Sequence, residues 1–199
     1  MGLRILVACE FSGIVRDEFR ALGHDAISCD LEPSERPGPH YQGDVRDLLG
    51  EPWDMMVAFP PCTHLCVSGA RSFAEKRDDG RQQEAVEFFM RLVEAQVPRI
   101  AIENPVGIMS RLYRRPDCII QPWQFGDQFS KRTCLWLKGL PPLLPICAVS
   151  PGEFYYPSSG GKRMPAWYAL APHTDRTKLR SRTFPGIARA MAQQWGTLE

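Results

Sequence analysis

Two kinds of apolar pattern alternate along the chain. Short, nearly continuous apolar runs have the length of buried strands, and they occupy residues 4–9, 25–29, 53–59, 99–103 and 133–137. Apolar side chains recur every three or four residues, as on the buried face of a helix, over residues 14–22, 82–96 and 185–195, with a shorter candidate at 107–113. Strands that alternate with helices predict an α/β fold with a doubly wound, mostly parallel sheet.

Polar segments rich in proline, glycine and charge separate these elements. The proline content and charge of residues 32–41 predict a loop there, and the polar composition of residues 68–80 predicts a connecting segment. The longest such segment, residues 139–182, has no periodic apolar pattern. Because no internal repeat or domain boundary is evident, we expect one domain over residues 1–199, with residues 140–182 as a basic, loop-rich insert.

The composition is that of an ordinary globular protein. With 199 residues, 44% hydrophobic and 24% charged, the chain can bury a proper core. No apolar run approaches the roughly 18–20 residues that cross a bilayer, and no leader-like segment precedes the first strand. Seven scattered cysteines are, by default, small buried hydrophobes in a cytosolic chain. We therefore expect a cytoplasmic protein without a membrane partner, and the sequence leaves open whether it forms a homo-oligomer.

Positive charge is concentrated near the C-terminus. Residues 160–189 hold seven basic residues and one acidic residue, about +6, so with a net charge of +1 the remainder is about −5. This asymmetry favours a surface that faces a polyanion, although a solvated basic tail is the alternative. The candidates for phosphate contacts are Arg163, Lys178, Arg180 and Arg182, with Trp167 and Tyr168 as stacking surfaces.

Two reactive side chains follow predicted strands. The run at 53–59 stops at Pro60 and Pro61, since proline cannot continue a central ladder, and Cys62 comes next. Glu103 ends the following strand. Neighbouring parallel strands would place both side chains at one edge of the sheet, where α/β folds bind ligands. A thiolate nucleophile beside a carboxylic acid suits addition to an electron-poor ring, and burial would raise the pKa of Glu103 and keep it a proton donor.

The pattern Cys62-x-His64-x-Cys66 also suggests a metal site. Structural zinc sites usually use CxxC-type spacing and a second ligand pair, and no second pair stands out here. We therefore expect no metal.

The first strand is followed by a turn of the nucleotide-binding type. Gly13 in Phe11-Ser12-Gly13 allows close approach of a ligand to a helix N-terminus, and Asp30 is placed to accept hydrogen bonds from ribose hydroxyls. A pyrophosphate-binding turn would have GxGxxG, and one glycine is too few. S-adenosylmethionine, which has no pyrophosphate, tolerates such a turn better, and an ordinary strand-to-helix loop is the alternative.

Taken as a set, these motifs resemble those of the DNA (cytosine-5) methyltransferases. The matching segments are, in order, Phe11-Ser12-Gly13, Asp30, Gly43-Asp44-Val45, Phe59-Pro60-Pro61-Cys62, Glu103-Asn104-Pro105-Val106, Phe125-Gly126 with Lys131-Arg132, and residues 184–195. The likeness covers most of residues 4–139. The chain is most similar to the short, stand-alone members often carried by bacterial viruses, which would place it in the host cytoplasm.

The resemblance implies a Rossmann-like methyltransferase fold, S-adenosylmethionine as cofactor and DNA as partner. The implied cofactor contacts are Phe11, Ser12 and Gly13 for the methionine part, Asp30 for the ribose, Asp44 and Val45 for the adenine, and Pro60. The implied catalytic residues are Cys62, which attacks cytosine C6, Glu103, which engages N3, and Arg132, which lies near the target base.

The sequence departs from this family at four places, one of which is the incomplete arginine motif at Lys131-Arg132. Val15 and Arg16 replace the later glycines of the first motif, and Thr63 replaces the glutamine after the nucleophile. The large target-recognition domain is absent, and only residues 139–182 take its place. Two alternatives therefore remain: the same chemistry on a free pyrimidine nucleotide or single strand, and a cofactor- or DNA-binding protein that has lost turnover.

Overall fold

The computed structural model describes residues 2–67, 73–156, 163–166 and 181–198. Its main sheet has seven strands in the order β3-β2-β1-β4-β5-β7-β6. They are β1 (Arg4–Ala8), β2 (Asp25–Asp30), β3 (His40–Gln42), β4 (Met55–Ala58), β5 (Arg99–Pro105), β6 (Cys118–Ile120) and β7 (Thr133–Lys138). Strands β1 to β5 are parallel, and β7 runs antiparallel to both of its neighbours. The expected α/β class with a mostly parallel sheet is confirmed.

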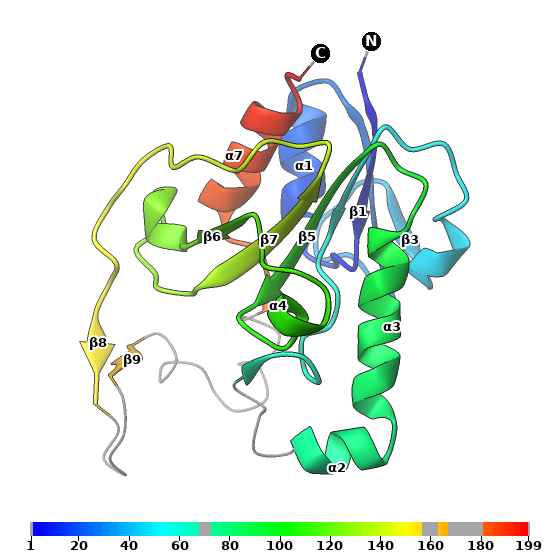
Figure 1. Ribbon diagram of the computed structural model, residues 1–199. Coiled ribbons are helices and arrows are strands. Elements are labelled where there is room, and N and C mark those ends of the chain that lie inside the picture. The colour runs from blue at the N-terminus through cyan, green and yellow to red at the C-terminus, as the bar shows by residue number, and fades with distance from the viewer. Residues whose placement is uncertain (1, 68–72, 157–162, 167–180, 199) are drawn as a thin grey trace.

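Helices cover both faces of this sheet (Figure 1). The described helices are α1 (Ile14–Ala21), α2 (Phe73–Asp78), α3 (Arg81–Val93), α4 (Met109–Leu112) and α7 (Pro185–Trp195), with single 3₁₀ turns η1 (Val45–Asp47) and η3 (Pro122–Gln124). Helices α1 and α7 pack side by side on one face, where Phe19, Met191 and Trp195 are fully buried. Helix α3 covers the other face with Phe89 and Leu92. A sheet that is apolar on both faces explains why its strands read as continuous apolar runs.

Five described elements differ from the sequence-based expectations. Strand β3 starts inside the segment expected to be a loop, strand β6 was not expected, and helix α2 lies in the polar connection at 68–80. The two strands have three residues each, too few to show a period. A small hairpin, β8 (Phe154–Tyr155) with β9 (Met164–Pro165), lies within the segment expected to be irregular.

Arg16, which replaces a glycine of the first motif, is a structural residue. Its side chain is completely buried, and its guanidinium donates to Ser28 Oγ, Ser34 Oγ and the carbonyl oxygen of Pro37 at 3.1, 3.2 and 3.0 Å. The neighbouring Asp17 supplies its counter-charge at 2.8 Å. Arg16 therefore fixes the loop between β2 and β3 against helix α1.

Candidate active site

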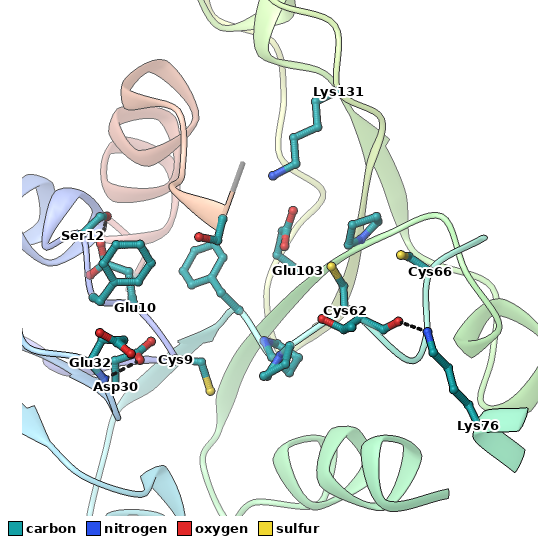
Figure 2. Close-up of a pocket in the computed structure, with 17 residues that line it drawn as sticks. Cys9, Glu10, Ser12, Asp30, Glu32, Cys62, Cys66, Lys76, Glu103 and Lys131 are labelled. Atoms are coloured by element: carbon teal, nitrogen blue, oxygen red, sulfur yellow. Dashed lines mark hydrogen bonds between the residues drawn. The ribbon is translucent and has the colours of Figure 1, made fainter. Parts of the chain in front are cut away.

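The carboxyl ends of four parallel strands meet at one edge of the sheet. Ala8 at the end of β1 is level with Cys29 on β2 and with Ala58 on β4, and Ala58 is level with Ile102 on β5. The segments that follow these strands line one cavity of about 560 Å³. Its walls include Cys9, Glu10, Phe11, Ser12, Asp30, Glu32, Phe59, Pro60, Pro61, Cys62, Thr63, Cys66, Lys76, Glu103, Pro105, Lys131 and Ser181 (Figure 2).

Cys62 and Glu103 both line this cavity, as the sequence predicted from successive strand ends. Cys62 begins a tight turn in which its carbonyl oxygen accepts from the backbone N–H groups of Leu65 and Cys66, both at 3.0 Å. A hydrogen bond with the Cys66 thiol, burial and the nearby Glu103 raise the pKa of Cys62 well above its usual range. The thiol is therefore the resting form, and a nearby cation is needed to favour the thiolate.

Burial also raises the pKa of Glu103, while Lys131 and a hydrogen bond with the Thr133 side chain oppose the shift. A raised pKa keeps a carboxyl group protonated closer to neutral pH, which is what a proton donor requires. The geometry thus places a nucleophile and a candidate acid in the same cavity.

Lys131, and not Arg132, lines this cavity beside Glu103. Figure 2 shows the Lys131 side chain reaching toward Glu103 from above, and its charge opposes the rise in the pKa values of both Cys62 and Glu103. Arg132 is exposed and lines a separate groove of about 480 Å³, which Lys131 also borders. The only sequence signal for Lys131 was its position next to Arg132.

Buried hydrogen bonds hold the Cys62 segment in place. The side-chain amide of Asn104 donates to the carbonyl oxygen of Pro60 at 2.9 Å, which ties the end of β5 to the end of β4. On the other side, Lys76 of α2 donates to the carbonyl oxygen of Thr63 at 2.8 Å (Figure 2), and Gln82 of α3 donates to that of His64 at 3.2 Å. These contacts make the turn that carries Cys62 part of the folded core.

The expected cofactor residues divide between two adjoining cavities. Phe11, Ser12, Asp30 and Pro60 line the cavity that contains Cys62. Gly13 follows in a left-handed conformation with φ +72°, which favours glycine and lets α1 begin close to the turn.

The second cavity measures about 270 Å³ and contains the expected adenine-contacting residues Asp44 and Val45. Cys9, Asp30 and Pro61 line both cavities, so the two lie side by side. Asp44 accepts from the backbone N–H of Arg46 at 2.9 Å, and hydrogen bonds from Arg46 lower the pKa of its carboxyl group. The pair of cavities offers an elongated site that runs from Val45 to Cys62.

The candidate phosphate-binding residues lie in different places. Arg163 is exposed and stacks over the ring of Phe154 at 4.1 Å, beside the groove that Arg132 lines. Arg182 donates to Glu35 at 2.7 Å, which anchors the end of the basic segment to the loop after β2. The remaining candidates, Lys178, Arg180, Trp167 and Tyr168, lie outside the described residues.

Among the described residues, no group of three or more histidine, cysteine, aspartate or glutamate side chains is arranged to hold a metal ion. In the same part of the chain, no helix has the length and apolar character that would cross a membrane.

Comparison with solved structures finds a similar fold in an E. coli protein that is encoded within a prophage and assigned as a DNA modification methyltransferase. The TM-score is 0.51 at 17% sequence identity, over 75% of this chain and 52% of that chain, so this chain spans about half the length of that protein. The likeness confirms the expected Rossmann-like type of fold, a mostly parallel sheet with helices on both faces. No protein-family model matches the sequence. No curated protein matches it either.

Proposed function

We propose that the chain transfers a methyl group from S-adenosylmethionine to C5 of cytosine in DNA, through a covalent adduct with Cys62. The observation that carries this proposal is that Cys62, Glu103 and Lys131 line one cavity, which continues into the turn at Phe11 and Ser12. The fold shared with the prophage protein assigned as a DNA modification methyltransferase supports methyl transfer in general.

The residues suggest an order of steps. Cys62 attacks C6 of the base as a thiolate, whose charge the Lys131 ammonium stabilises. The bond from Sγ to C6 forms, electron density moves toward N3, and protonated Glu103 donates a hydrogen bond or proton there. S-adenosylmethionine, when bound, supplies an electrophilic methyl group to C5. A water molecule then takes the C5 proton, the bond from C6 to Sγ breaks and releases the Cys62 thiolate, and a proton held at N3 returns to Glu103, which restores the aromatic ring.

The cavities fit such a cofactor. Asp30 lies where both cavities meet, as a ribose-binding acid would, and burial raises the pKa of its carboxyl group. Its Oδ1 atom accepts from the backbone N–H of Glu32 at 3.0 Å, which fixes the orientation of the carboxyl group. In this arrangement Val45 and Asp44 would contact the adenine, and Phe11 and Ser12 the methionine part.

A groove beside the catalytic cavity supports a nucleic-acid substrate over a free nucleotide. Gln121, Trp123, Ser130, Lys131, Arg132, Pro151, Phe154 and Pro165 line it. Aromatic rings next to cations suit bases and phosphates of a nucleic-acid strand. Because Lys131 borders both the groove and the cavity, a strand in the groove would bring its neighbouring base to Cys62.

Trapping of the covalent adduct tests the proposal. The protein is incubated with S-adenosylmethionine and an oligonucleotide that contains 5-fluorocytosine, whose C5 fluorine blocks the final elimination. We expect a denaturation-resistant adduct that Cys62→Ser abolishes, while Cys147→Ser, a change at an exposed cysteine, leaves it intact.

Comparison of substrates separates the alternatives. Equal trapping on the free nucleotide would favour a nucleotide substrate, and trapping restricted to single strands would exclude duplex DNA. Cofactor binding without an adduct on any substrate would identify a protein that has lost turnover and would refute the proposed reaction.

A further inference from the structure

Glu10 is a buried acidic side chain in the wall of the larger cavity, and none of the motifs above accounts for it. Burial raises the pKa of its carboxyl group, while hydrogen bonds from Ser12 and from backbone N–H groups at the start of α1 oppose the shift. Its side chain is only 4% exposed. One oxygen, Oε1, accepts from Ser12 Oγ at 2.5 Å and from the backbone N–H of Val15 at 3.4 Å. The other, Oε2, is shielded from solvent and has no hydrogen-bond partner in the part of the chain that the structure describes. A buried oxygen without a partner is costly, so it requires an explanation.

The nearest arginine does not satisfy Glu10. The guanidinium of Arg16 is engaged by Asp17, by the serines Ser28 and Ser34, and by loop carbonyl oxygens. Acidic groups also dominate this end of the cavity, where Figure 2 shows Glu10, Asp30 and Glu32 together. The lysines that line it, Lys76 and Lys131, lie at the far end with Cys62 and Glu103 (Figure 2). This end of the cavity therefore attracts a cationic group.

Glu10 also changes what the start of helix α1 can bind. The first backbone N–H groups of a helix usually favour an anion, and in many nucleotide-binding folds they hold a phosphate. Here the Oε1 atom of Glu10 accepts from one of these groups, that of Val15. A phosphate at this position would meet a carboxylate, so the turn disfavours phosphorylated cofactors.

We propose that Glu10 binds the amino group of the cofactor's methionine part and that the same carboxylate excludes phosphorylated nucleotides from this turn. The inference rests on the proposed function and deepens it. A small rotation of the Glu10 side chain would bring Oε2 to the cavity that this residue lines, where the ammonium group of the bound cofactor donates to it and supplies the partner that this oxygen lacks. A charge-assisted hydrogen bond of this kind is among the stronger contacts that a small ligand makes.

Calorimetric titration with two ligands tests this assignment without turnover. S-adenosylhomocysteine has the amino group, whereas 5′-methylthioadenosine has the same adenosyl part and lacks the whole amino-acid portion. In Glu10→Gln, we expect the affinity for S-adenosylhomocysteine to fall at least about tenfold, since a charged partner is lost. The affinity for 5′-methylthioadenosine should be unchanged. Glu18→Gln, the same substitution at a half-buried residue of α1 that faces Arg189 of α7 and lines neither cavity, should alter neither affinity.

The thermal midpoint of the ligand-free protein gives a second readout. If Glu10 were only structural, Glu10→Gln would lower the midpoint. If Glu10 instead serves to bind a ligand, its buried charge destabilises the ligand-free protein. We then expect Glu10→Gln to raise the thermal midpoint at neutral pH.

The outcomes separate the two proposals. If both ligands bind the wild type and Glu10→Gln weakens them equally or not at all, the role of Glu10 is refuted and the cofactor assignment survives. If the wild type binds neither ligand, both proposals fail. Binding of ATP at comparable affinity to the wild type would overturn the exclusion of phosphates.

Discussion

Asn104 and Pro60 join the two halves of the candidate catalytic pair. The side-chain amide of Asn104, on β5, donates to the carbonyl oxygen of Pro60, after β4, at 2.9 Å. Asn104 is 1% exposed and follows Glu103 directly, while Pro60 lies two residues before Cys62. This buried hydrogen bond therefore fixes the position of the nucleophile relative to the acid.

Loss of that hydrogen bond should destabilise the fold. Asn104→Ala leaves the Pro60 carbonyl oxygen without its partner, and we expect the free energy of unfolding to fall by about 1–3 kcal/mol in urea titrations. Gln83→Ala is the control, because Gln83 donates to Glu87 at an exposed position on α3, and its effect should stay within about 0.5 kcal/mol. Equal effects of the two changes would argue against a special role for Asn104.

Lys131 should control the reactivity of the nucleophile. Its ammonium lowers the pKa of Cys62, so Lys131→Met should raise that pKa and slow alkylation of Cys62 by iodoacetamide. At a pH below the pKa, each unit of increase slows the reaction about tenfold. The rate is followed by mass spectrometry of the Cys62 peptide across a pH series. Lys131→Arg should preserve the rate, and so should Lys138→Met, at the other end of β7, where Lys138 donates to the carbonyl oxygen of Ala95.

Glu103 should make stability depend on pH. Because burial raises its pKa in the folded state above the unfolded value, the folded state binds more protons between the two values. Its contribution to stability is then greatest below the unfolded pKa and is lost as the pH rises through the folded one. Glu103→Gln should therefore stabilise the protein at neutral pH, by an amount that shrinks as the pH falls. Urea titrations at several pH values measure this, and a difference that does not vary with pH would contradict it.

Arg16 should be essential for stability although it stands where the related motif has glycine. Arg16→Met removes the donors that hold the loop before β3 and leaves Asp17 without its closest partner. Removing one member of a buried charged network costs about 3–5 kcal/mol. Arg20→Met, at a side chain that is 41% exposed, should cost about 0.5 kcal/mol or less in the same urea titration. A small effect at Arg16 would show that other contacts hold the loop.

The sequence by itself determined the α/β class, because the sheet is buried on both faces and its longer strands are continuous apolar runs. It also placed Cys62 and Glu103 together, since parallel neighbouring strands end at one edge of the sheet. The sequence did not reveal the short strands β3 and β6, because three residues are too few to show an alternating pattern of apolar and polar side chains. The reversed direction of β7 was also left undetermined, since an apolar run has no direction of its own.

Only the tertiary structure decided which polar side chains share the cavity. Lys131 and Arg132 are adjacent and both basic, and the path of the backbone before β7 directs one to the cavity and the other to the outer groove. Glu10 belongs to none of the recognised motifs. Its burial and its oxygen without a hydrogen-bond partner result from the packing of β1, β2 and α1 around it. The local pattern of apolar and polar residues determines the helices, the longer strands and the positions where these strands end. Contacts between segments distant in the sequence determine the burial, protonation state and pKa of the side chains in the cavity.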